Sequence, residues 1–337
     1  MSLMKDGKLL DDWLDAETKD GEFERMESTF RNWITPDGAA GPTGEGGFAA
    51  EPGRYHLYVS YACPWAHRTL IFRRLKKLED AITVSVVHPH MGPEGWRFGD
   101  FPGAGPDTVN GCDFLHQVYT RADPHYTGLV TVPALWDKQR GSIVNNESSE
   151  IIRMLNSAFD AWGDAGADFY PVELRNEIDA VNDLVYAHIN NGVYRTGFAA
   201  TQKAYERNCV RLFKALDELE TRLSRQRYLA GSRITEADWR LFPTLIRFDA
   251  VYVGHFKCNL RRIRDYPNLY QFMLELYQWP GIAETVRFDH IKHHYYRSHP
   301  ELNPRGIVPL GPEQDLDTPH RRDAQMAGMG TIPSQHP

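Results

Sequence analysis

The 337-residue sequence has few cysteines, no long apolar run and no excess of basic residues. Its four cysteines are too few for a disulfide-stapled scaffold and too far apart for paired zinc-ligand motifs. No stretch approaches the ~20 apolar residues of a membrane span, and the N-terminus lacks the apolar core of a secretion signal. A formal net charge of −7 offers no basic surface to nucleic acid or anionic lipid. We therefore expect a cytoplasmic protein whose partners include neither nucleic acid nor membrane.

The two ends of the chain differ in composition from its middle. Residues 1–54 contain two aromatic anchors, Trp13 and Trp33, and a loop, residues 38–47, in which five of ten positions are glycine. Residues 299–337 contain seven of the 21 prolines and show no periodicity. We expect an N-terminal extension with a glycine-rich loop, and an extended C-terminal tail that is partly packed and partly disordered.

Residues 55–160 alternate between strand and helix patterns. Strand-like segments at 55–60 and 82–88 flank a helical stretch, which predicts a βαβ unit. The Gly-, Pro- and Asp-rich stretch 89–128 is predicted to be irregular, and its length suggests a functional loop. Two further strand patterns then predict a hairpin that leads into a helix beginning at Ser148.

Residues 170–298 carry helical periodicity instead. Apolar residues recur every three or four positions between 174 and 189 and again between 205 and 223. Thr235, followed three positions later by Asp238, predicts a capped helix start. This half of the chain is therefore expected to be an all-helical domain.

Cys63 lies at the predicted turn from strand to helix, with Pro64 at the first helical position. Unpaired N–H groups and the helix dipole favour a thiolate there, which makes Cys63 a candidate nucleophile. The alternative, a buried inert cysteine, suits Cys209 better because it falls on an apolar helical face. Cys112 and Cys258 are interpreted as structural.

Ala66 occupies the position where a dithiol redox motif would have its second cysteine. Cys63 therefore has no local partner with which to form a disulfide, and any second thiol must come from outside the chain. Glutathione is the abundant candidate in most cytosols.

Val132-Pro133 and Glu147-Ser148 follow in an order that suggests a peptide-binding site. A cis-proline turn would leave backbone groups free to pair with a peptide, and the helix start would offer N–H, hydroxyl and carboxylate groups to its charged end. Each motif alone also has a structural interpretation, Pro133 as an edge-strand proline and Ser148 as a helix cap.

The order of these elements resembles the glutathione transferase architecture, α/β plus all-α. It implies an N-terminal thioredoxin-like domain (βαβ-ββα, residues 55–160) that binds glutathione, followed by a helical C-terminal domain (170–298) that binds the substrate. Within that superfamily the chain resembles the Xi class, the glutathionyl-hydroquinone reductases, from about Trp33 to Pro312. Five segments carry the resemblance: Cys63-Pro-Trp-Ala-His-Arg68, Gly95-Trp-Arg-Phe98, Asn145-Asn-Glu-Ser-Ser-Glu150, Asn191-Gly-Val-Tyr-Arg195 and His293-His-Tyr-Tyr296.

The resemblance implies a reaction in which the Cys63 thiolate attacks the glutathione sulfur of a glutathionyl-hydroquinone. Free hydroquinone leaves, and a second glutathione resolves the Cys63–glutathione mixed disulfide. The family implies a homodimer and no metal. Carried over to matching positions, glutathione is held by Trp96, Leu129, Val130, Thr131, Val132, Glu147 and Ser148. Tyr194 assists proton transfer at the aromatic substrate, and Tyr252 and Tyr295 lie near the thiolate.

Simpler interpretations stand beside these assignments. The three tyrosines could be core residues, since most of the 16 tyrosines must pack. His290, His293 and His294 have a spacing that could hold a metal ion, but no acidic or thiol ligand stands close by in the sequence, which favours solvated or hydrogen-bonded side chains. The basic run Arg73, Arg74, Lys76 and Lys77 is interpreted as a solvated helix face.

Two other functions compete with the reductase. A broader thioltransferase would use the same Cys63 on glutathione mixed disulfides. A non-catalytic interaction module would keep the fold and need no reactive thiol.

Overall fold

The computed structural model describes residues 2–10, 18–19, 21–23 and 25–327. Contacts divide the chain into two compact units. Unit 1 comprises Met1–Lys19, Glu24–Asp168 and Thr285–Pro309, and unit 2 comprises Asp20–Phe23, Phe169–Glu284 and Leu310–Pro337. The expected anchor Trp13 and the end of the expected tail, residues 328–337, lie outside the described residues.

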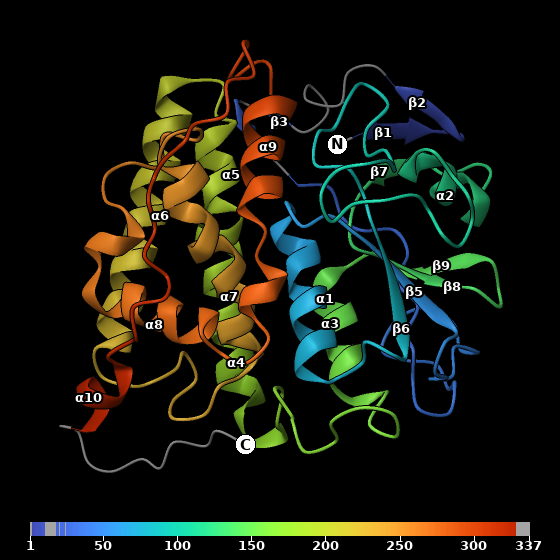
Figure 1. Ribbon diagram of the computed structural model, residues 1–337, viewed down its shortest axis with the longest axis horizontal. Coiled ribbons are helices and arrows are strands. Elements are labelled where there is room, and N and C mark those ends of the chain that lie inside the picture. Colours follow the sequence, from blue (N-terminus) through green and yellow to red (C-terminus); the bar gives the residue numbers. More distant parts are fainter. Residues whose placement is uncertain (1, 11–17, 20, 24, 328–337) are drawn as a thin grey trace. The chain divides into compact units, whose positions relative to one another are not determined.

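A four-stranded sheet, in the order β6-β5-β8-β9, forms the centre of unit 1. β5 (Tyr55–Val59) runs parallel to β6 (Ile82–Val86) and antiparallel to β8 (Ala134–Asp137), which pairs with β9 (Ser142–Asn145). Every residue of β5 is buried. The helices α1 (Pro64–Leu75) and α3 (Ser148–Ser157) lie side by side next to the sheet (Figure 1). The predicted βαβ unit, hairpin and following helix are confirmed, and the unit is thioredoxin-like.

The N-terminal extension contributes strands that the sequence patterns did not predict. β1 (Ser2–Lys5) pairs antiparallel with both β2 (Lys8–Leu10) and β7 (Gly128–Val130). Two further short strands are β3 (Thr18–Lys19) and β4 (Glu22–Phe23). The described parts of the extension therefore belong to the folded body.

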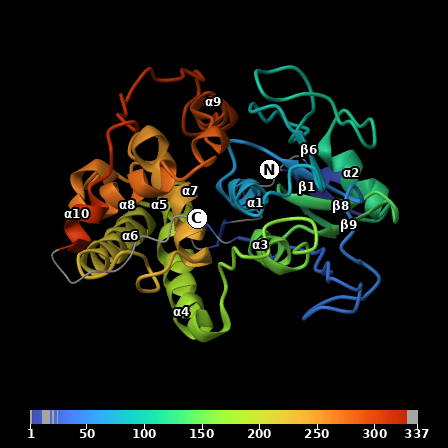
Figure 2. The ribbon, with the colours of Figure 1, turned by 60° about the horizontal axis from the view of Figure 1, so that its bottom comes forward.

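The prediction that residues 89–128 lack regular structure is wrong for α2 (Leu115–Ala122), which Figure 2 shows beside β9. This eight-residue helix buries Leu115, Val118 and Tyr119, a three-residue apolar face. Such a short helix gives too few turns for its periodicity to stand out from the surrounding glycines and prolines.

α9 (Phe288–Ser298) belongs to unit 1, whereas the expected helical domain extended to residue 298. The ring of His290 contacts the carbonyl of Pro102 through Nε2 at 2.7 Å. Thr285, just before α9, has its Oγ1 2.7 Å from Nε2 of His67 on α1. α9 and Thr285 before it thus belong to unit 1 through contacts with the loop at Pro102 and with His67 on α1, although α9 is helical like unit 2.

The basic run on α1 is not a solvated face throughout, so that interpretation is wrong for Lys76. Its side chain is buried, and its ammonium group donates to Asp160 Oδ1 at 2.9 Å and to the carbonyl of Ala167 at 2.7 Å. Arg74 and Lys77 are exposed. Lys76 therefore connects the end of α1 to residues 160–167 by hydrogen bonds. The charge pattern of α1 alone does not reveal these partners.

Unit 2 is built from helices. The capped helix start at Thr235 is confirmed, because Asp238 Oδ2 accepts from the backbone N–H of Thr235 at 2.7 Å. Its helices are η2 (Val172–Leu174), α4 (Arg175–Val185), η3 (Tyr186–Asn190), α5 (Gly192–Gly197), α6 (Gln202–Leu223), α7 (Glu236–Arg247), η4 (Phe248–Tyr252), η5 (Ile263–Asp265), α8 (Pro267–Tyr277) and α10 (Arg322–Ala327). The short helix η6 (Ala283–Thr285) spans the boundary between the units, with Thr285 in unit 1.

The tail from Leu310 to Ala327 packs on the helices of unit 2. Gln278 donates to the carbonyl of Leu316 at 2.9 Å. Arg322 is fully buried, and its guanidinium donates to the carbonyls of Leu223, Gln226 and Arg227 at 2.9, 2.8 and 2.6 Å. Leu223 is the last residue of α6, and Gln226 and Arg227 come shortly after it. The tail therefore provides donors for carbonyls at and just beyond the helix end, where helical hydrogen bonds stop.

His56, on β5, makes the stability of the fold depend on pH. Its side chain is buried, and burial lowers its pKa to about 4. Between that value and the ~6.5 of an unfolded histidine, the folded state binds fewer protons, so stability falls as the pH is lowered through this range. We expect a loss of about 2 kcal/mol between pH 7 and pH 5 from this group, measured by urea unfolding. His56→Gln should flatten the pH dependence. An unchanged slope in His56→Gln would refute the assignment.

Candidate active site

Cys63 is the N-cap residue of α1, as predicted, and Pro64 occupies the first helical position. The backbone N–H of Cys63 donates to the carbonyl of Ser60 at 3.2 Å, which fixes the turn after β5. The thiol is partly exposed, and its Sγ lies 3.4 Å from the carbonyl oxygen of Val132. The helix N-terminus directs unpaired N–H groups toward this position, where negative charge on sulfur is favoured.

The other three cysteines lie in a different environment. Cys112, Cys209 and Cys258 are buried, and burial raises the pKa of each thiol above its usual value. They therefore stay in the unreactive thiol form at neutral pH. The interpretation of Cys209 as a buried helical residue is confirmed.

Two guanidinium groups flank the ring of Trp65, two residues after Cys63. The carbon Cζ of Arg68 lies 4.6 Å from the ring centroid and that of Arg25 lies 4.8 Å from it. Arg68 is buried and donates to Ser148 Oγ at 3.3 Å. Positive charge is thus concentrated beside the first turns of α1 and α3, where the dipoles of both helices already favour anions. Arg25 was not predicted, because nothing in the sequence around it marks its position.

The segment before Pro133 is fixed by hydrogen bonds to neighbouring side chains. The Val132-Pro133 peptide bond is cis, which decides between the two interpretations of Pro133 in favour of the cis turn. The Tyr119 hydroxyl donates to the Thr131 carbonyl at 2.8 Å, and the Thr131 N–H donates back at 3.3 Å. Leu129 and Val130 belong to β7 and pair with β1. Among the four expected glutathione positions in this segment, Val132 therefore contacts Cys63, while Leu129 and Val130 take part in a sheet.

Glu147 and Ser148 begin α3. Glu147 is the N-cap residue, and its Oε1 accepts from the N–H of Ser149 at 3.0 Å and from its hydroxyl at 2.9 Å. Ser148 is the first helical residue and is buried. A carboxylate, a hydroxyl and a helix N-terminus therefore occur together, as the sequence predicted, and they can complement a ligand that carries charges of both signs.

Trp96 and Tyr295 lie near one another in unit 1. The indole of Trp96 stacks on His294, with ring centroids 4.7 Å apart, and its N–H has no hydrogen-bond partner among the described residues. His294 in turn contacts the carbonyl of Pro89 through Nδ1 at 3.0 Å. Tyr295 follows directly on α9 and is buried. The rings of His290 and His294 therefore each form a hydrogen bond with a backbone carbonyl.

Tyr194 and Tyr252 come together in unit 2, with ring centroids 6.2 Å apart. Phe256 stacks on Tyr252 at 5.6 Å, and Phe23 packs beside Tyr194 at 6.3 Å. Tyr252 is fully buried, as a core tyrosine would be, while Tyr194 keeps a small exposed area. Phe23 was not predicted because it lies far from the helical segments in the sequence.

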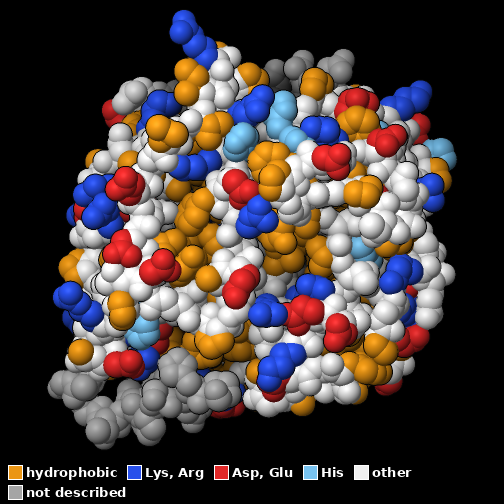
Figure 3. All heavy atoms as spheres, in the orientation of Figure 1, with side chains coloured by type: hydrophobic (Ala, Val, Ile, Leu, Met, Phe, Trp, Pro, Cys, Tyr) orange, Lys and Arg blue, Asp and Glu red, His pale blue; other side chains and the backbone are white. Residues whose placement is uncertain are grey.

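Figure 3 shows acidic and basic side chains interspersed over one face, without a large basic area among the described residues. In the same part of the chain, no cluster of three or more His, Cys, Asp and Glu residues has the geometry of a metal site. None of the described helices is both long and apolar enough to cross a bilayer.

Comparisons with known proteins identify the family. Family models for the N-terminal and C-terminal domains of glutathione S-transferase match residues 62–158 and 202–274. The glutathionyl-hydroquinone reductase YqjG of Escherichia coli is 57% identical over 96% of this chain and 99% of its own length. PcpF of Sphingobium chlorophenolicum, which has the same enzyme name, is 54% identical over 94% of this chain and 98% of its own. This chain belongs to the glutathionyl-hydroquinone reductases.

Solved structures agree with this Xi-class assignment. The glutathione-bound structure of YqjG superimposes with a TM-score of 0.87, 59% identity and coverage of 88% of this chain and 97% of its own. A Xi-class transferase from Natrialba magadii gives a TM-score of 0.90 at 49% identity, covering 96% of this chain and 98% of its own.

The contrast between Cys63 and the three buried thiols predicts selective alkylation. Iodoacetamide at pH 7 should modify one cysteine rapidly in the folded reductase, and peptide mass spectrometry should place the adduct on Cys63. Cys63→Ser should abolish the rapid phase, whereas the matched control Cys209→Ser should retain it. Rapid labelling of a second cysteine would contradict the burial of the other three.

Proposed function

We propose that this family member reduces glutathionyl-hydroquinones to free hydroquinones through Cys63. The observation that carries the proposal is a partly exposed thiol at the N-terminus of α1, next to Val132 and without a second cysteine at position 66. YqjG and PcpF, two relatives that share most of the chain's length, are named for this reaction.

In the first step, the Cys63 thiolate attacks the sulfur that joins glutathione to the aromatic ring. A sulfur–sulfur bond forms and the carbon–sulfur bond breaks, so the bonding electron pair stays on the ring carbon, which takes up a proton. In the second step, a glutathione thiolate attacks the mixed disulfide, releasing oxidised glutathione and the Cys63 thiolate. The ring is thereby reduced, and two glutathione sulfurs are oxidised.

The charges at the start of α3 suit the γ-glutamyl end of glutathione. The Glu147 carboxylate is complementary to the ammonium group of that end. The Ser148 hydroxyl, backed by the buried Arg68 and the α3 N-terminus, is complementary to its carboxylate. Val132 is assigned to the peptide backbone of glutathione.

Trp96, Leu129, Val130 and Thr131 complete the proposed glutathione set. Trp96 is supported by its indole N–H, which lacks an acceptor among the described residues. For the other three, the assignment rests on the family resemblance.

The aromatic ring of the substrate is assigned to the tyrosines. Tyr194 is proposed to pass the proton to the ring, and Tyr252 and Tyr295 are proposed to stabilise the thiolate, because phenolic hydroxyls donate hydrogen bonds without adding a charge. The aromatic cluster around Tyr194 suits a flat substrate.

Simple thioltransfer makes no use of such a cluster, so the broader thioltransferase is the second candidate. A non-catalytic interaction module would need no reactive Cys63, so the partly exposed thiol argues against that alternative. The cytoplasmic location and the homodimer stay predictions.

Replacing the nucleophile tests the first step. Cys63→Ser leaves a hydroxyl that is hardly ionised at pH 7, so hydroquinone release should almost vanish while the thermal unfolding midpoint stays close to that of the unsubstituted protein. After exposure to substrate, mass spectrometry of the unsubstituted protein should find one added glutathione, on Cys63. An intramolecular disulfide, or full activity in Cys63→Ser, would refute the mechanism.

Removing one hydroxyl separates the two enzyme candidates. Tyr194→Phe should slow hydroquinone release by ~10²–10⁴-fold, because it removes the proposed proton donor. Reduction of a glutathione mixed disulfide should suffer far less, since a thiolate leaves without much proton assistance. The matched control is Tyr270→Phe, which removes a hydroxyl that donates to the carbonyl of Asp315 in the tail. Equal losses on both substrates in Tyr194→Phe would argue for a role in the fold or in glutathione binding.

A further inference from the structure

The N-terminal extension lies along the free edge of β9, just before the proposed glutathione site. The N–H of Asn32 donates to the carbonyl of Val144 at 3.0 Å, and the N–H of Asn146 donates to the carbonyl of Phe30 at 3.1 Å. Between these bonds, Arg31 forms an antiparallel bridge with Asn145. Residues 30–32 thus continue the sheet beyond β9 and accompany the chain to the start of α3.

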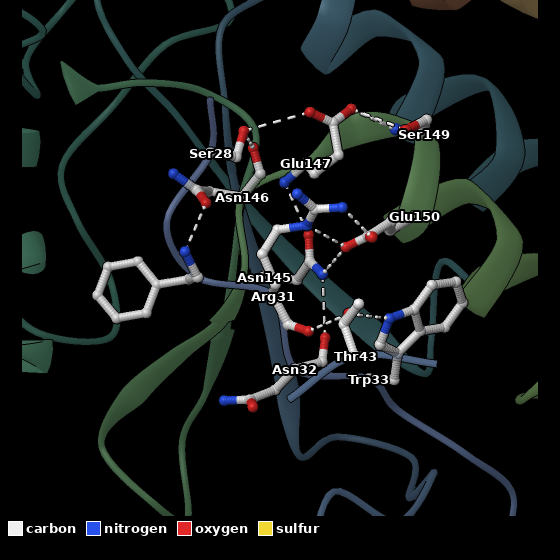
Figure 4. A network of polar contacts seen from close by, with 11 residues as sticks. Ser28, Arg31, Asn32, Trp33, Thr43, Asn145, Asn146, Glu147, Ser149 and Glu150 are labelled. Atoms are coloured by element: carbon white, nitrogen blue, oxygen red, sulfur yellow. Dashed lines mark hydrogen bonds and ion pairs between the residues drawn. The ribbon is translucent and has the colours of Figure 1, made fainter. Parts of the chain in front are cut away.

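Side chains connect this segment to the first turn of α3 (Figure 4). Arg31 forms an ion pair with Glu150 and donates to it through Nε at 2.8 Å. Asn145 donates to Glu150 Oε2 at 2.7 Å and accepts from the N–H of Glu147 at 2.7 Å. The backbone at Glu147 is therefore fixed by contacts that begin in the extension.

Ser28 reaches the functional carboxylate itself. Its Oγ lies 3.2 Å from Glu147 Oε2 and 3.2 Å from the carbonyl oxygen of Asn146. On the opposite side, Ser149 donates to Glu147 Oε1 through both its N–H and its hydroxyl. In Figure 4 the carboxylate lies between the two serines. Ser149 thus donates to one oxygen, and the Ser28 hydroxyl shares its single proton between the other oxygen and the Asn146 carbonyl, so rotation of the carboxylate is restricted.

We propose that Ser28 is a positioning residue that orients Glu147 toward the ammonium group of the γ-glutamyl end of glutathione. The inference rests on the proposed function and adds a contribution of the N-terminal extension to ligand recognition. A carboxylate held in its binding orientation loses less freedom when the ligand arrives, so the serine hydroxyl increases affinity without contacting the ligand. Ser28 stands outside every motif that carried the family resemblance.

The test is calorimetric binding of glutathione to the full-length protein. Ser28→Ala should weaken binding about 3- to 10-fold, the effect of one hydrogen bond. Ser28→Thr, which keeps the hydroxyl, should restore most of the affinity. The matched control is Ser157→Ala, at the far end of α3, which removes an exposed hydroxyl that donates to the carbonyl of Arg153 and should leave affinity unchanged.

A second peptide separates positioning from a general structural effect. Glutaryl-cysteinylglycine has the shape of glutathione but lacks the α-amino group, so the Ser28→Ala penalty should disappear for this peptide. Unchanged glutathione affinity in Ser28→Ala, or equal weakening for both peptides, would overturn the role of Ser28. Failure of the unsubstituted protein to bind glutathione would instead overturn the proposed function.

Discussion

The position of Cys63 depends on the burial of β5. This strand forms the middle of the unit 1 sheet with no exposed residue, so the turn after it cannot shift without disturbing both neighbouring strands. Pro64 starts α1 immediately after the turn, which leaves the thiol at the helix N-terminus and Val132 opposite it. A small, partly exposed sulfur is thereby held by some of the least exposed backbone in the chain, and the electrostatics of the helix act on it directly.

The start of α3 receives similar support, but from a different part of the chain. Arg68 on α1 contacts Ser148, while residues 28–32 contact the turn that precedes the helix. The glutathione-transferase sheet is thus extended at its edge by residues from the N-terminal extension. That segment does more than cover an exposed strand, because its polar side chains join those of the helix start in one connected network.

Local signals in the sequence were sufficient for the main elements. The strand pattern before Cys63, the proline after it and the capping pair Thr235 and Asp238 each specify a structure within a few residues, and all three were confirmed. Contacts between residues far apart in the sequence could not be predicted from such local signals. Lys76 is buried because Asp160 and Ala167 approach it from a distant segment, and α9 joins unit 1 through residues such as Thr285 and Pro102. Charge patterns and periodicity describe one element at a time and leave its partner unspecified.

Arg322 has a consequence for the order in which the chain can fold during synthesis. Its buried guanidinium satisfies carbonyls just after α6, about a hundred residues earlier, and residues 21–23 supply Phe23 to the same unit. Unit 2 is therefore assembled from pieces near both ends of the described chain. On the ribosome, where domains usually fold as they emerge, the packing of its helices is complete only after residue 322, about a hundred residues beyond the end of α6, has been translated.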